Sequence, residues 1–147
     1  MENLGYLLGD SSRLLRYDFD DRVRMVGVTG PQARLLLNLA RSEGENQGFF
    51  ADALEVEPIT LCRMVDRMAE AGLIERRRDP ADRRAWRLHL TERSRPMIAR
   101  LRECVDALVE DMMQGVDAAE RGAFAQTLIA IRANLAARRA DRTTVNG

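Results

Sequence analysis

The sequence predicts a mainly helical protein that carries one small β-hairpin. Apolar residues recur at intervals of three and four through most of the chain, which is the spacing of helices that bury one face. Strict alternation of apolar and polar residues occurs near the middle, where Trp86, Leu88 and Leu90 share one face of an expected strand. The length of 147 residues and the 46% hydrophobic content suit one compact domain.

The composition excludes several classes of function. The 23 basic residues balance the 23 acidic ones, and every basic residue is arginine. Without lysine the chain has no Schiff-base lysine and no P-loop lysine. His89 is the only histidine, and with Cys62 and Cys104 it gives too few ligands for a classical zinc site. No set of carboxylates converges on a nucleophile, so we expect no enzyme activity, no cofactor and no metal.

The apolar segments are too short to cross a membrane. None approaches the roughly 18 consecutive apolar residues that a spanning helix requires. The two widely spaced cysteines and the lack of an apolar leader give no sign of a secreted disulfide scaffold. We therefore expect a cytoplasmic protein.

Three helices are expected in the first third of the chain. Residues 4–26 form the first, with a disturbance of the helix near Gly9 as the alternative. Thr29 can cap a second helix over residues 30–41, whose apolar centre suits a buried element. A short third helix covers residues 47–54.

A fourth helix follows Pro58, which is tolerated only in the first helical turn. It spans residues 59–71 and stops at Gly72. Its apolar stripe contains Leu61, Met64, Val65 and Met68, and outside the stripe lie Thr60, Arg63, Asp66, Arg67 and Glu70. Two short helices joined by a tight turn predict a helix-turn-helix, whose second helix enters the DNA major groove. An ordinary helical hairpin with solvated arginines is the alternative.

The hairpin follows directly, with a turn at residues 79–82. From Leu73 to Leu90 there are six arginines and three acidic residues, a net charge of 6 − 3 = +3 in a chain whose total is zero. Guanidinium groups on such a hairpin can enter the minor groove beside a bound helix. The alternatives are a hairpin with solvated charges, or a wing that contacts another protein without specific DNA binding.

Residues 54–91 resemble the MarR family of winged-helix transcriptional regulators, and the SlyA-like branch most. The resemblance rests on the segments LCRMVDRM (residues 61–68), AGLI (71–74), DPADRR (79–84) and RLHLT (87–91). Its most specific part is Asp-x-x-Asp-Arg-Arg, followed two residues later by Arg-Leu-x-Leu-Thr. Flanking helices extend it over nearly the whole chain.

The resemblance implies a homodimer that binds a pseudopalindromic operator in double-stranded DNA, as a transcriptional regulator and more specifically a repressor. It implies that the outward face of residues 60–67 lies in the major groove and the tip of the hairpin in the minor groove. Our candidate DNA contacts are Pro58, Thr60, Cys62, Arg63, Arg67, Arg83, Arg84 and Arg87, with Asp79 and Asp82 shaping the turn.

The C-terminal third carries two further apolar stripes. Met97, Leu101, Val105, Leu108 and Met112 form the first, and Phe124, Leu128, Ile131 and Leu135 form the second. An Asp117/Glu120 capping box separates them. These stripes could complete a monomeric bundle, but we favour a dimer because residues 30–90 already account for a winged-helix core.

The expected organisation is thus a DNA-binding lobe over residues 29–90, a dimerisation region over 1–28 and 91–140, and a flexible tail over 141–147. The expected dimer interface contains Leu7, Phe124, Leu128, Ile131 and Leu135.

In the MarR family, small aromatic or phenolic anions often bind between the dimer arm and the DNA-binding lobe. Arg13, Arg16 and Tyr17 on the first helix could supply charge and an aromatic face for such an effector. The alternative is that they are surface or interface residues. Cys62 and Cys104 are either inert thiols or sites of oxidation.

Overall fold

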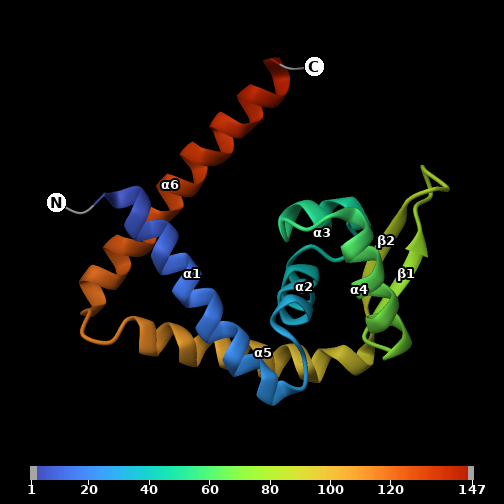
Figure 1. Cartoon of the computed structure of the whole chain (residues 1–147), viewed down its shortest axis with the longest axis horizontal. Helices are drawn as coiled ribbons and strands as arrows, with labels where there is room; N and C mark the ends of the chain where they lie inside the picture. Colours follow the sequence, from blue (N-terminus) through green and yellow to red (C-terminus); the bar gives the residue numbers. More distant parts are fainter. Residues whose placement is uncertain (1–2, 146–147) are drawn as a thin grey trace. The chain divides into compact units, whose positions relative to one another are not determined.

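The computed structural model describes residues 3–145 and is mainly helical (Figure 1). The elements are α1 (Leu4–Val23), the 3₁₀ helix η1 (Arg24–Val26), α2 (Gly30–Arg41), α3 (Gln47–Ala53), α4 (Pro58–Glu70), β1 (Ile74–Arg78), β2 (Trp86–Leu90), the 3₁₀ helix η2 (Glu92–Ser94), α5 (Arg95–Met112) and α6 (Ala118–Val145). β1 and β2 form an antiparallel hairpin. The predicted fold class, mainly helical with a small β-hairpin, is confirmed.

Between residues 3 and 145 no helix combines the length and apolar character needed to span a membrane.

The chain divides into a compact unit that ends at Val109 and a second unit that begins at Glu110. One apolar core fills the first unit, with fully buried side chains that include Val23, Leu35, Leu36, Leu39, Phe50, Leu61, Val65, Leu88 and Leu101. Thus α1 and α5 contribute to the same core as the helix-turn-helix. The compact unit therefore extends beyond the lobe of residues 29–90 that the sequence predicted.

The junction between α1 and α2 rests on close contacts of Asp20. Its carboxylate accepts a hydrogen bond from Arg34 at 2.6 Å and packs against Gly30, where a Cβ atom would overlap it. Thr29 and Gln32 form the capping box of α2. The first helix is continuous, as expected, and is not disturbed at Gly9, where a single glycine costs only about 1 kcal/mol relative to alanine.

The last helix continues to Val145, so residues 141–145 are helical where we expected a flexible tail. No glycine or proline follows Gly122 before Gly147, so no strong helix breaker ends α6 earlier. Residues 146 and 147 of the expected tail lie outside the described residues. The predicted Asp117/Glu120 capping box is present at the start of α6.

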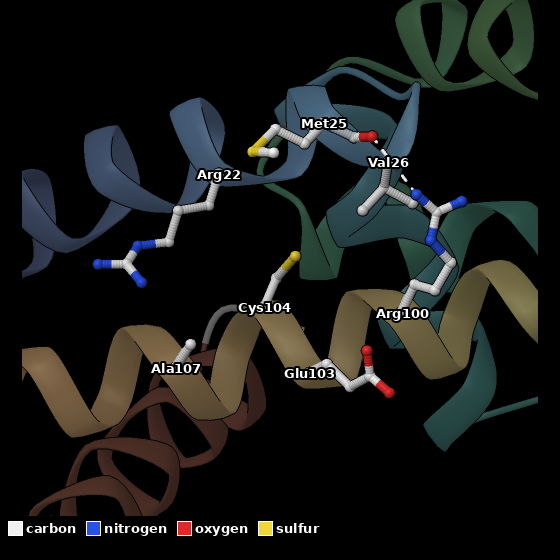
Figure 2. Close-up of a pocket in the computed structure, with 7 residues that line it drawn as sticks. All are labelled: Arg22, Met25, Val26, Arg100, Glu103, Cys104 and Ala107. Carbon is white, nitrogen blue, oxygen red and sulfur yellow. Dashed lines mark hydrogen bonds between the residues drawn. The ribbon is translucent and has the colours of Figure 1, made fainter.

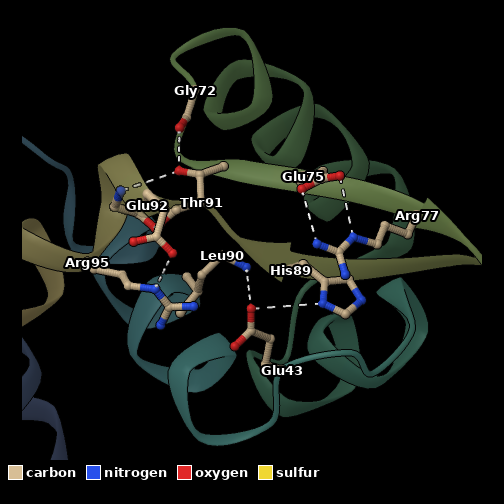
Figure 3. Close-up of polar contacts among 10 residues, drawn as sticks. Glu43, Gly72, Glu75, Arg77, His89, Leu90, Thr91, Glu92 and Arg95 are labelled. Carbon is tan, nitrogen blue, oxygen red and sulfur yellow. Dashed lines mark hydrogen bonds and ion pairs between the residues drawn. The ribbon is translucent and has the colours of Figure 1, made fainter.

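The hairpin is anchored to the helices by residues 43–46, which run beside β2. Gly44 donates to the Leu88 carbonyl at 2.9 Å, and the Leu88 N–H donates to the Glu45 carbonyl at 3.0 Å. The Glu43 carboxylate accepts the N–H of Leu90, and at the same end of the hairpin the Thr91 hydroxyl donates to the Gly72 carbonyl at 2.6 Å (Figure 3). These bonds fix the base of the hairpin, so its free end is the turn.

Candidate nucleic-acid interface

The exposed face of α4 carries four of the eight residues predicted to contact DNA. Leu61, Val65 and Met68 are buried on one side of the helix, which turns Pro58, Thr60, Arg63 and Arg67 to solvent. Within residues 3–145 neither Arg63 nor Arg67 has an ion pair or a side-chain hydrogen bond. Both arginines border a groove of about 300 Å³ between α4 and the start of α2.

Cys62 does not belong to this exposed face. Its side chain is half-buried, and its Sγ lies 3.7 Å from Nη2 of Arg76 on β1. The same Nη2 donates to the Cys62 carbonyl at 3.1 Å. A residue one position before Arg63 is turned by about 100° around the helix. Cys62 therefore faces the hairpin, unlike the other predicted residues of α4.

Arg76 holds the hairpin against the helices, a role that the sequence did not reveal. Its Nε donates to Oε1 of Gln47 at 2.7 Å, and its Nη1 lies 2.6 Å from Oδ1 of Asp66. With the bond to Cys62, one guanidinium therefore connects β1 to the start of α3 and the middle of α4. The strand register pairs Arg76 with the buried Leu88, which places both on the face that packs on the helices. Side chains of a strand alternate between its two faces, so the strand pattern in the sequence was the signal that could have placed Arg76 on the inner face.

The turn of the hairpin is shaped by its two predicted aspartates. Asp79 accepts the N–H of Ala81 at 2.8 Å, and Asp82 accepts the N–H of Arg84 at 2.9 Å. The bond from Ala81, followed by that from Arg87, lowers the pKa of the Asp79 carboxyl. Since its folded pKa is depressed, Asp79 stabilises the turn at neutral pH, and this contribution is lost only as the pH falls through that lowered pKa.

The free positive charge of the hairpin is concentrated at its tip. Arg87 pairs with Asp79 at 3.1 Å and Arg77 with Glu75 at 3.3 Å. Arg78 lies over the ring of Trp86, 4.8 Å from its centroid, and donates to the Arg83 carbonyl. The exposed guanidinium groups of Arg83 and Arg84 have no ion pair or side-chain hydrogen bond with any described residue. The structure thus leaves these two arginines available to an anionic partner.

Apolar side chains remain uncovered on α1 and α6. Leu7, Phe124 and Leu135 are exposed, and Leu128 and Ile131 are half-buried. Among its described residues α6 contains no buried one. The five side chains predicted for a dimer interface are therefore at least partly accessible.

A pocket of about 400 Å³ lies between α1, α2 and α5. Its lining includes the apolar side chains of Leu15, Phe19, Leu37 and Leu108, and three arginines, Arg16, Arg34 and Arg41. Of the three residues proposed for an effector, only Arg16 lines it. Arg13 and Tyr17 lie elsewhere, with Arg13 bound to Asp10 at 2.6 Å and stacked on the Tyr17 ring. Their positions on α1 turn them away from α2.

A second pocket, of about 360 Å³, lies between the end of α1, η1 and α5 and contains the thiol of Cys104 (Figure 2). Arg100 borders it and donates to the Met25 carbonyl at 3.4 Å. Cys104 is half-buried, and its pocket is separate from the exposed face of α4.

Comparisons with known proteins agree with this geometry. A model of the MarR family matches residues 26–85. The transcriptional regulator PA3341 is 32% identical over 90% of this chain and 98% of its own, with a TM-score of 0.78. The transcriptional repressor CouR, solved with a 23-mer DNA duplex, is 31% identical over 88% of this chain and 92% of its own, with a TM-score of 0.73. A structure of MarR shares the fold, with 24% identity, 95% coverage of both chains and a TM-score of 0.85.

The family model covers the helix-turn-helix and the first part of the hairpin, and the chain covers 98% of PA3341 and 92% of CouR, at 32% and 31% identity. The chain therefore belongs to the MarR family.

Proposed function

We propose that this protein is a sequence-specific regulator of transcription that binds double-stranded DNA. The observation that carries the proposal is a set of four exposed arginines without acidic partners among the described residues, namely Arg63 and Arg67 on α4 and Arg83 and Arg84 at the hairpin tip. A helix in the major groove and a basic hairpin in the adjacent minor groove use such charges to bind phosphates and base edges. Pro58 and Thr60 complete the proposed contact surface, whereas Cys62 and Arg87 are engaged within the protein.

The proposal extends to repression. CouR, a transcriptional repressor whose structure was solved with a 23-mer DNA duplex, has a similar fold and is 31% identical to this chain over the matched residues. A repressor is therefore the favoured form of the regulator. The hairpin motif of residues 79–91 also supports a relationship to the SlyA-like branch.

The proposed regulator is a homodimer, which the uncovered apolar side chains of α1 and α6 support. Burying Leu7, Phe124 and Leu135 against a second copy would remove apolar area from water. A dimer with twofold symmetry presents two equal helix-turn-helix units, so its binding site in DNA would be a pseudopalindrome.

The test is selection of DNA from a random pool, followed by binding titrations at several salt concentrations. We expect an inverted repeat to be enriched and the affinity for it to fall steeply with salt, because bound arginines release counterions from the phosphates. A hairpin that contacts another protein instead would enrich no DNA sequence.

We further propose that the pocket between α1, α2 and α5 binds a small aromatic anion that releases the protein from DNA. Arg34 is already paired with Asp20, which leaves Arg16 and Arg41 to bind a carboxylate beside the apolar wall. Benzoate and hydroxybenzoates should raise the melting temperature and weaken DNA binding. Arg16→Ala should abolish both effects, and Arg13→Ala is the matched control because Arg13 lies outside the pocket. Equal responses of both variants would exclude this pocket.

A further inference from the structure

Two large hydrophobic side chains are exposed between residues 29 and 90, those of Phe49 and Ile59. Phe49 is 42% exposed and has an aromatic partner, since its ring packs edge-on against Phe50 at 5.1 Å between centroids. Ile59 is 59% exposed, more than any other large hydrophobic residue of this segment. Ile59 is therefore the less well covered of the two.

The position of Ile59 on α4 is opposite to the buried stripe. With about 100° between successive helical residues, Ile59 points roughly 180° away from Leu61, Val65 and Met68 taken together. Arg63 and Arg67 follow at intervals of four, on the same outward side. The isoleucine thus stands at the leading end of the stripe that carries the two unpaired arginines of α4.

Neither helix propensity nor core packing explains an isoleucine at position 59. A β-branched residue is a weaker helix former than alanine or glutamate, and Ile59 packs into no core. Pro58 holds the first position of α4 and fixes the start of the helix, so the placement of the next side chain is well defined. Its apolar branch is available to a partner.

On the major-groove edge of DNA the one apolar group is the C5-methyl group of thymine. We propose that Ile59 contacts this methyl group and selects thymine at a fixed position of each half-site, next to the base pair that Arg63 contacts. The inference rests on the proposed DNA-binding function and adds a specificity-determining residue to it.

The test removes the methyl group from the DNA instead of only changing the protein. Fragments enriched by the selection are synthesised with thymine or with uracil, which lacks the C5-methyl group. For the wild type, we expect uracil to weaken binding about fourfold per buried methyl group, or about fifteenfold for two half-sites. Ile59→Ala should bind thymine DNA correspondingly less tightly and should respond little to uracil.

Two further variants make the comparison specific. Ile59→Val keeps the branched methyl groups and should retain most of the response to uracil. Ile129→Ala removes the same atoms from a residue of α6 that is 50% exposed, and should respond to uracil as the wild type does.

The outcomes separate the two proposals. Equal sensitivity to uracil in the wild type and in Ile59→Ala would overturn the role of Ile59 and leave DNA binding intact. Failure to enrich any DNA would overturn both.

Discussion

Nη1 of Arg76 lies 2.6 Å from Oδ1 of Asp66, an ion pair that joins the first strand of the hairpin to the middle of α4. The side chain of Arg76 is only 20% exposed, and it also donates to Gln47 and to the carbonyl and Sγ of Cys62. A planar guanidinium can hold three partners in fixed directions, which the more flexible lysine ammonium cannot. The orientation of the hairpin relative to α4 therefore depends on this residue.

Arg76→Ala should lower the free energy of unfolding by about 1–3 kcal/mol, because it leaves the partly buried Gln47 and the Cys62 carbonyl without their donor. Urea denaturation measures this change. Arg77→Ala is the matched control: its exposed pair with Glu75 should be worth less than about 1 kcal/mol. If the two variants lost equal stability, Arg76 would not hold the hairpin as we describe.

The basic residues of the hairpin show where sequence analysis was sufficient and where it was not. The sequence indicated a turn at residues 79–82 and an arginine-rich tip, and the structure contains both. It did not distinguish Arg76 and Arg87, whose charges are engaged, from Arg83 and Arg84, whose charges are free. That distinction depends on partners far along the chain, such as Gln47, which local spacing does not reveal.

The same limit applies to the first helix and to the end of the chain. Arg13 and Arg16 are three positions apart, and only contact with α2 and α5 decides that Arg16 lines a pocket. The tail was predicted from its polarity, but polarity alone does not end a helix, and with no glycine or proline to interrupt it α6 continues to Val145. Helix boundaries set by strong local signals, such as Thr29 and Gly72, agreed with the structure.

The proposed dimer can be tested on α6. Leu128→Glu/Leu135→Glu places two charges on the predicted interface, where they would be buried without partners, and should dissociate the dimer. Analytical ultracentrifugation measures the change. Ala133→Glu/Ala137→Glu adds the same charges to the opposite side of the helix and should leave the dimer intact. A dimer that persists in the first variant would mean that α6 does not form the interface.

Arg63 is expected to recognise bases. A bidentate contact between arginine and guanine discriminates against the wrong base by about 1–3 kcal/mol, whereas a phosphate contact discriminates little. Arg63→Ala should therefore weaken binding to the selected DNA about 5- to 150-fold, and binding to random DNA much less. Competition titrations with both DNAs give the ratio. Equal losses on the two DNAs would assign Arg63 to the phosphates.

Arg83 and Arg84 are expected to act through the shape and potential of the minor groove. The edges of the bases there distinguish A·T from G·C pairs and little more, but a narrow A·T-rich groove has a deeper negative potential that attracts guanidinium groups. Arg83→Ala/Arg84→Ala should thus lower the affinity for all DNA sequences. Binding through fewer arginine–phosphate contacts releases fewer counterions from the DNA. The dependence of log affinity on log salt should therefore become shallower by about one unit per contact removed.

A lysine variant separates charge from shape at the same two positions. Arg83→Lys/Arg84→Lys keeps both positive charges, so the salt dependence should stay close to that of the wild type. Its compact, strongly hydrated ammonium groups fit a narrow groove less well than planar guanidinium groups, so the preference for A·T-rich flanking sequence should fall. Arg77→Ala is the control within the hairpin, because the charge of Arg77 is already paired with Glu75. If the double alanine variant kept the affinity and the salt dependence of the wild type, the tip would not contact DNA, and the turn ordered by Asp79 and Asp82 would instead favour contact with another protein.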